Sequence, residues 1–185
     1  YTGGGSILLH PLGTSDWGGG GYHFRPVEDG SGRMVIRVAN LTLSWTDSTT
    51  KAHMEDASAG NWQNWAIVRD GNGVTLYING ASMGQKTLGS TQGATTVDKI
   101  GSGWTSGASS DEWIGNIDEV ALFDATLDAD AMTTIYNSGT PTDLSSEDNL
   151  VAYWRLEEGG GTSAADSSAN SNTGTLINGP AYSTT

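Results

Sequence analysis

The chain has 185 residues and a formal net charge of −13 at pH 7, because 21 Asp and Glu residues outnumber 8 Lys and Arg residues. Such a charge repels a phosphate backbone, so no nucleic-acid partner is expected, and a chain without cysteine forms neither a disulfide nor a thiolate metal site. No apolar run approaches the roughly 20 residues that cross a bilayer, so no membrane insertion is expected.

Short strands separated by glycine-rich turns are predicted for the first part of the chain. Residues 22–27 and 33–40 flank the turn Asp29-Gly30-Ser31-Gly32 and predict a hairpin, which residues 41–45 continue as a further strand. Residues 47–60 are polar, and we predict a loop there.

A second hairpin lies at the centre of the chain. Its arms are residues 64–70 and 74–79, and the turn Asp70-Gly71-Asn72-Gly73 joins them. In the second arm Val74, Leu76 and Ile78 share one face, whereas both faces of the first arm are apolar, which predicts a central strand. A hairpin alone cannot bury so much apolar surface, so we expect a second sheet packed against it.

One helix is predicted, at residues 128–139. Asp128 is a suitable N-cap, Leu127 and Met132 can form a hydrophobic staple, and Gly139 can end the helix. Further strands are predicted at residues 82–88, 95–100, 113–123, 150–156 and 175–177. The sum of about ten or more short strands and one helix is typical of an antiparallel sandwich of two sheets.

Several motifs in this order resemble a known family. They are WAIVRD at 65–70, LYING at 76–80 and GNIDEV at 115–120, followed by Leu122-Phe123 and by Leu127 before the helix. This order resembles the laminin-G-like, concanavalin A-like domains. The resemblance implies an all-β, two-sheet antiparallel jelly-roll sandwich with one short helix over residues 1–139.

The remaining residues resemble an extension found in some members of that family. The stretches YNSG at 136–139, LVAYWRL at 150–156 and NGP at 178–180 resemble the carboxy-terminal extension of such domains in structural proteins of marine phages and viruses. The resemblance implies that residues 140–185 form an extension whose strands join the same sandwich.

The family's first strands have no counterpart before Tyr1. Either the chain is truncated, or residues 150–156 fill the position that those strands would take in the sandwich. The second option has a corollary, which is that a sheet edge left unfilled could accept a strand from a neighbouring copy.

Catalysis is not expected. The resemblance includes glucanases, whose paired acidic residues share one face of a strand, but strand alternation places the adjacent Asp118 and Glu119 on opposite faces. The three histidines, His10, His23 and His53, have no acidic or serine partner at a motif spacing, so a catalytic triad or zinc site is not expected.

A calcium site is one interpretation of the polar stretch near the carboxyl end. Asp166, Asn170 and Asn172 alternate with other residues in a loop, which places oxygen atoms on one side of a turn, and Asp118 could complete the ligands. The alternative is a turn rich in Asp and Asn that is closed by its own backbone hydrogen bonds.

Sugar binding would use exposed aromatic rings on loops. Trp104 in GSGWTSG and Trp17 in SDWGGGG are the best candidates, because neither lies in an alternating run. The other tryptophans considered are expected in the core: Trp62, Trp65, Trp113 and Trp154.

Two functions are consistent with the sequence, both non-enzymatic and both placed outside the cell or on a virion surface. In the first, the chain is a structural or decorating protein of a virion or extracellular assembly, and its partners are other copies or other subunits. In the second, it is a carbohydrate-binding adhesion module of a secreted or cell-surface protein that contacts surface glycans.

Overall fold

The computed structural model describes residues 9–11, 22–27, 33–38, 41–90, 97–102 and 113–183. The chain divides into two compact units, Tyr1–Gly115 and Asn116–Thr185, and each is described by itself. The sequence prediction of a sandwich over residues 1–139 with an extension over 140–185 that joins it concerns a different division of the chain, and it stays a prediction.

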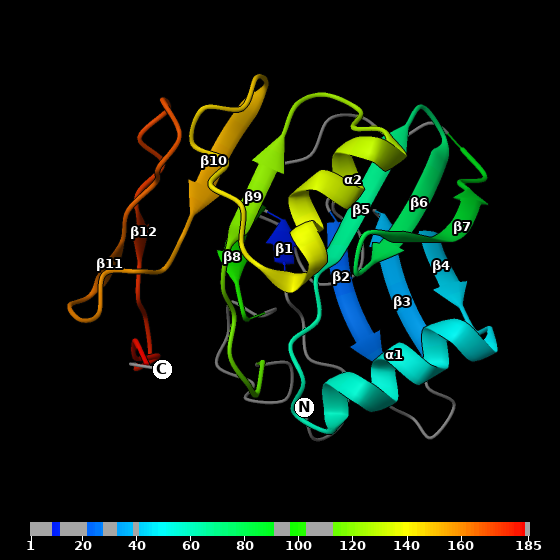
Figure 1. Cartoon of the computed structure of the whole chain (residues 1–185), viewed down its shortest axis with the longest axis horizontal. Helices are drawn as coiled ribbons and strands as arrows, with labels where there is room; N and C mark the ends of the chain where they lie inside the picture. The colour runs from blue at the N-terminus through cyan, green and yellow to red at the C-terminus, as the bar shows by residue number, and fades with distance from the viewer. Residues whose placement is uncertain are drawn as a thin grey trace. The chain divides into compact units, whose positions relative to one another are not determined.

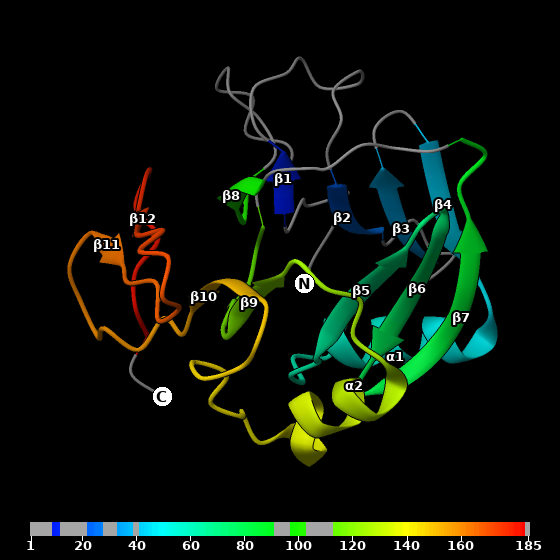
Figure 2. The same ribbon diagram turned by 90° about the horizontal axis from the view of Figure 1, so that it is seen from above.

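The first unit contains two antiparallel sheets (Figure 1). Its strands are β1 (Leu9–Pro11), β2 (Tyr22–Val27), β3 (Arg33–Val38), β4 (Leu41–Trp45), β5 (Trp65–Asp70), β6 (Gly73–Ile78), β7 (Ala81–Thr87) and β8 (Val97–Ile100). One sheet has the order β4-β3-β2-β1-β8 and the other the order β5-β6-β7. Figure 2 shows the two sheets of this unit as separate layers. Among the described strands β5 pairs only with β6, whereas the sequence predicted a central strand there.

The core of the first unit lies between these sheets. Its buried residues are Leu43, Trp45, Met54, Val74, Leu76, Ile78 and Leu88. The predicted inward face of β6 is confirmed, because Val74, Leu76 and Ile78 are fully buried. The indole Nε1 of Trp45 donates a hydrogen bond to the carbonyl oxygen of Gly84 at 2.9 Å, which ties β4 to β7 across the core.

The loop predicted for residues 47–60 is wrong, because helix α1 (Ser48–Ser58) lies there. Asp47 caps it: its carboxylate accepts hydrogen bonds from the backbone N–H of Thr50 at 2.9 Å and from the Thr50 hydroxyl at 2.8 Å. Thr50 and Met54 are buried and lie four residues apart, on one face of the helix. Of these two residues only Met54 is apolar, so the buried face of the helix does not stand out in a polar stretch.

The second unit contains β9 (Val120–Phe123), α2 (Ala129–Tyr136), a 3-10 turn (Asn137–Gly139), β10 (Leu150–Trp154), β11 (Ser163–Ala164) and β12 (Gly174–Thr175). β9 pairs antiparallel with β10, and β11 with β12. The predicted strand at 113–123 is wrong in its first part. Gly115 and Glu119 have φ angles of 144° and 52°, which interrupt an extended run before β9.

Helix α2 confirms the helix prediction. The Asp128 carboxylate accepts a hydrogen bond from the backbone N–H of Ala131 at 2.8 Å, and Met132 is buried. The helix ends at Asn137, which has a left-handed φ of 43°, two residues before the predicted stop at Gly139. The described residues thus form antiparallel sheets and two short helices, and neither helix is long and apolar enough to cross a bilayer.

Replacing the cap of α1 tests the corrected helix assignment. We expect Asp47→Ala to lower the free energy of unfolding by about 1 kcal/mol, because it removes the acceptor for the buried Thr50. Urea denaturation followed by circular dichroism measures the change. Glu55→Ala is the control, since it removes only an exposed ion pair with Lys51, worth less than about 0.5 kcal/mol. Equal effects of the two substitutions would contradict the capping role.

Candidate functional site

The pairing of β9 with β10 brings together charged residues that are far apart in the sequence. Trp154 lies opposite Val120 in an antiparallel register, so the residues just before β9 meet the residues just after β10. Asp118 and Glu119 therefore lie beside Arg155 and Glu157. The candidate site of the second unit lies at this end of the β9-β10 pair.

Three acidic side chains converge at this point. One carboxylate oxygen each from Asp118, Glu119 and Glu157 lies within 4.8 Å of the others. Partial burial raises the pKa of Asp118 and of Glu119, and the neighbouring negative charges of Glu157 and Asp118 add to the rise. Oxygen-only ligands of this kind suit a hard divalent cation such as calcium, which would relieve the repulsion.

The expectation that Asp118 and Glu119 point to opposite faces is wrong for their carboxylates. It assumed regular strand alternation, but Glu119 has a φ of 52° and lies outside β9. Leu156, on the other side of the pair, also has a positive φ, of 59°. Two non-glycine residues in this uncommon conformation turn the chain out of the sheet and allow the carboxylates to meet.

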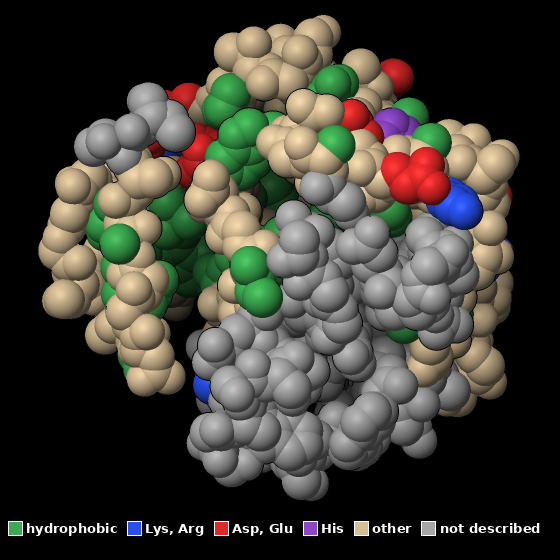
Figure 3. Space-filling view, turned by 90° about the horizontal axis from the view of Figure 1, so that it is seen from below, with side chains coloured by type: hydrophobic (Ala, Val, Ile, Leu, Met, Phe, Trp, Pro, Cys, Tyr) green, Lys and Arg blue, Asp and Glu red, His purple; other side chains and the backbone are tan. Residues whose placement is uncertain are grey.

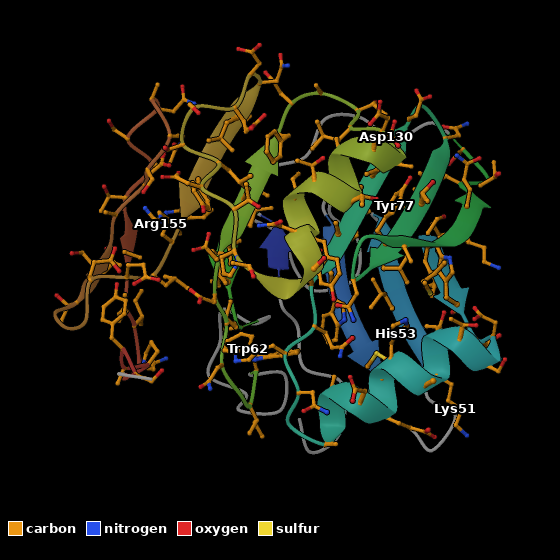
Figure 4. All side chains as sticks on the ribbon, in the orientation of Figure 1. Lys51, His53, Trp62, Tyr77, Asp130 and Arg155 are labelled. Atoms are coloured by element: carbon orange, nitrogen blue, oxygen red, sulfur yellow. The ribbon has the colours of Figure 1, made fainter. Side chains whose placement is uncertain are left out.

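Glu119 is held by two neighbouring side chains. The buried Tyr153 hydroxyl donates to the Glu119 Oε2, and it also lies 3.2 Å from the carbonyl oxygen of Thr142. Burial and the adjacent Glu119 raise the pKa of Tyr153, so the phenol keeps its proton. Arg155 lies between two acids, with its Nε 4.0 Å from Glu119 Oε1 and its Nη1 3.7 Å from Asp143 Oδ2 (Figure 4).

The residues predicted for calcium occupy a different position. The Asp166 carboxylate accepts four hydrogen bonds, from the backbone N–H groups of Tyr153, Ser168 and Asn172 and from the Ser168 hydroxyl. Burial opposes its ionisation, but these hydrogen bonds outweigh that effect and lower the pKa of Asp166 to about 2. Four bonds use the lone-pair positions of a carboxylate.

Asn170 and Asn172 complete the same contact. Their side-chain amides donate to the carbonyl oxygens of Leu150 and Val151 at 2.9 to 3.1 Å. The loop therefore covers one edge of β10 with hydrogen bonds from its side chains. The structure brings Asp166, Asn170 and Asn172 together on β10 and groups Asp118 with Glu119 and Glu157, and calcium binding stays a prediction.

The tryptophans considered in the sequence analysis differ in their exposure and in whether the structure describes them. Trp17 and Trp104 lie outside the described residues, so sugar binding by them stays a prediction. Trp62 was expected in the core, but it is 62% exposed, and that expectation is wrong. Trp154 is buried as expected, and Trp65 packs edge to face on Trp113 with ring centroids 5.9 Å apart.

The second unit also contains a small apolar cavity of about 130 Å³. Its wall includes Phe123, Leu127, Ile135 and Leu144, and one acid, Glu147. Pockets that enclose small-molecule ligands usually measure about 300 to 1,000 Å³. This cavity is therefore a packing gap beside α2 rather than a site for a sugar.

Sequence reasoning missed Glu157, Tyr153 and Arg155. Each follows from the register of β10 against β9, which no motif reports. The signal available was the length match between the apolar runs at 120–123 and 150–154, with acidic residues at 118–119 and 157–158 at the ends that an antiparallel pair would join.

The sequence matches one family model, and the fold is similar to solved structures. The model of the concanavalin A-like lectin/glucanases superfamily matches residues 2–132. Among solved structures, a Bacteroides ovatus protein named a “putative carbohydrate binding protein” is similar at a TM-score of 0.58 and 15% identity, over 95% of this chain and 51% of that one. The chain thus spans about half the length of that protein, and the likeness is one of fold.

Another solved structure, an S-layer domain-containing protein from Clostridium thermocellum, has a TM-score of 0.34 and 21% identity, over 74% of this chain and 66% of that one. No curated protein matches the sequence.

Asp166 should stabilise the second unit at neutral pH. We expect Asp166→Ala to lower the free energy of unfolding by about 2 kcal/mol at pH 7, because it leaves the buried N–H of Tyr153 without an acceptor. The pKa of Asp166 falls from 3.8 to about 2 on folding, so its contribution is complete above pH 4 and is lost as the pH falls through 2.

Urea denaturation of wild type and variant at pH 7, 4 and 2, followed by tryptophan fluorescence, measures this contribution. The exposed Asp148→Ala serves as control and should change little. A gap between wild type and Asp166→Ala that stays constant down to pH 2 would contradict the assignment.

The three carboxylates of Asp118, Glu119 and Glu157, called the carboxylate group below, are expected to affect stability in opposite directions with and without calcium. In EDTA, Glu157→Gln should raise Tm by about 2 °C, because it removes a repelling charge. With millimolar calcium the wild type should gain stability and the variant should gain much less. Differential scanning calorimetry measures both. Calcium that leaves the wild-type Tm unchanged would rule out a cation at Asp118, Glu119 and Glu157.

Proposed function

The protein belongs to the concanavalin A-like lectin/glucanases superfamily, and from that membership we propose that it is a non-enzymatic carbohydrate-binding module. The observation that carries the proposal is the likeness of fold to the Bacteroides ovatus protein, which extends over 95% of this chain and which bears a carbohydrate-binding name. The proposed full fold is a jelly roll of two antiparallel sheets, and the proposed location is secreted or at a cell surface.

The chemistry of the described surface supports sugar recognition. Carboxylates accept hydrogen bonds from sugar hydroxyls, and an arginine donates them. The site at the ends of β9 and β10 offers both, with Asp118 and Glu157 exposed and Arg155 half-buried between Glu119 and Asp143. A calcium ion on the carboxylate group would add a further point at which hydroxyls could bind.

The absence of catalysis is part of the proposal. Glycosidases oppose two carboxyl groups across the scissile bond, and one of them transfers a proton while the other attacks or activates water. Here the three carboxylate oxygens lie within 4.8 Å, and Glu119 is engaged by Tyr153. Such a crowded group is better suited to holding a cation or several hydroxyls than to placing a sugar between two acids.

The other reading of the sequence, a structural or decorating protein of a virion, has no supporting observation among the comparisons. We therefore take carbohydrate binding, which the sequence offered as its alternative, as the main function. Adhesion and contacts with other subunits stay predictions.

A glycan array tests the proposed function. We expect the 185-residue chain to bind one class of immobilised glycan saturably, to remain monomeric in analytical ultracentrifugation and to leave the glycan intact in chromatography. Binding in calcium and in EDTA is compared on the same array. Release of shortened glycans, or assembly into particles or fibres without binding to any glycan, would contradict the proposal.

A further inference from the structure

Trp62 is a large apolar side chain that lies exposed on the first unit. Its side chain is 62% exposed, and it lies in the segment between α1 and β5. Transfer of a large aromatic side chain out of water is worth about 2 to 3 kcal/mol, so an indole left in solvent forgoes that stabilisation. A single exposed apolar residue is common, and the surroundings decide whether it has a role.

The residues on both sides of Trp62 are fixed by hydrogen bonds. Asp56 of α1 accepts one from the Asn61 amide at 2.6 Å and another from the Gln63 amide at 2.5 Å. These two bonds join the segment to the helix immediately before and immediately after the exposed ring. The backbone N–H of Asn61 also donates to the carbonyl oxygen of Asp56 at 3.3 Å.

A second set of bonds joins the same segment to the β5-β6 hairpin. Asn79 donates from its side chain to Gln63 Oε1 at 2.8 Å, and His53 Nδ1 lies 3.2 Å from the same oxygen. Asn64 and Asn79 exchange two further bonds, of 2.9 and 2.8 Å. The segment is therefore anchored to a helix and to a sheet.

These bonds hold the polar side chains against the unit and leave the indole outside. Figure 4 shows the Trp62 side chain directed away from His53 and α1. In the space-filling view, acidic side chains flank the histidine on the face that α1 forms (Figure 3). The ring is thus presented on a pre-ordered segment, which lowers the entropy lost when a ligand binds to it.

We propose that Trp62 is the stacking platform on which this module binds a neutral sugar ring, an inference that rests on the proposed carbohydrate-binding function. The indole face would pack against the C–H face of a pyranose. Asn61 uses one amide hydrogen on Asp56, and the rest of its exposed amide can bond sugar hydroxyls.

The negative charge of the chain favours a neutral sugar over an acidic one. A net charge of −13 repels uronate and sulfated glycans. Asp56 accepts hydrogen bonds from the side-chain amides of Asn61 and Gln63, the two residues next to Trp62. Because its carboxylate is engaged in this way, Asp56 is not a site for a basic ligand. A neutral pyranose brings no charge to this surface, and the ring contact supplies the affinity.

The test uses the whole chain and an array of neutral gluco-, galacto-, manno- and xylo-oligosaccharides. The oligosaccharide that binds wild type best is then titrated against Trp62→Ala, Trp62→Phe and the control Ile114→Ala, which removes another exposed apolar side chain from the same unit. We expect Trp62→Ala to weaken binding at least about tenfold, as at other tryptophan contacts, Trp62→Phe to retain most of it and Ile114→Ala to change it less than twofold.

Fluorescence gives a direct readout of the contact. The difference between the spectra of wild type and Trp62→Phe isolates the Trp62 emission, which should shift to shorter wavelength and become protected from acrylamide when the oligosaccharide binds. A merely structural tryptophan would show neither change.

The outcomes separate the two proposals. Unchanged binding by Trp62→Ala, or a loss seen only in Trp104→Ala or Trp17→Ala, overturns the platform and leaves carbohydrate binding intact. Wild type that binds no glycan overturns both. Self-association that Trp62→Ala abolishes, with glycan binding unaffected, would show that the ring serves a protein contact instead.

Discussion

The one-sided burial of β6 is the constraint on which the first unit depends. Val74, Leu76 and Ile78 are fully buried in the core, and a shift of register by one residue would turn all three toward the other face of the sheet. The register places Ile78 opposite Trp65, so Asn79, just past the end of β6, reaches Asn64, just before β5. Those contacts hold the segment that carries Trp62. Hydrophobic burial on one face of a strand thus determines the position of an exposed ring.

The second unit repeats this logic with a different pair of strands. Ala152, Tyr153 and Trp154 are buried, and their alignment with β9 sets which residues meet beyond the ends of the pair. The charged group of Asp118, Glu119 and Glu157 is a consequence of that alignment. The loop around Asp166 then satisfies the main-chain groups of β10 that β9 does not reach, which removes an edge that another strand could join.

Features that depend on residues close in sequence could be predicted. Alternation in β6 and the Asp128 cap of α2 are local, and both predictions are confirmed. The family motifs are also local, and the predicted laminin-G-like resemblance is confirmed by the match over residues 2–132. Helix α1 was missed because its buried side includes a threonine, Thr50, whose burial is made possible by a hydrogen bond to Asp47 rather than by an apolar side chain.

Apart from Asp118, the residues of the candidate sites could not be predicted, because their positions depend on features that periodicity does not encode. Strand alternation predicted that Asp118 and Glu119 point to opposite faces. The positive φ of Glu119 interrupts the regular strand, so this alternation does not hold there. Trp62 precedes an apolar strand and so resembled a core residue. The structure shows that Asn61 and Gln63, on either side of it, are hydrogen-bonded to Asp56 and Asn79 while the ring itself is exposed.

The arrangement around Trp62 and the carboxylate group of the second unit make different demands on a ligand. A stacked ring offers an apolar contact that changes little with salt or pH, because no charge is exchanged with water. The carboxylate group binds through charge, and the raised pKa values of Asp118 and Glu119 make it sensitive to acid and to a divalent cation. A glycan held mainly by Trp62 would therefore stay bound in EDTA and at mildly acid pH, whereas one held through a cation would be released by both. The dependence of binding on calcium thus identifies which of the two surfaces carries the affinity.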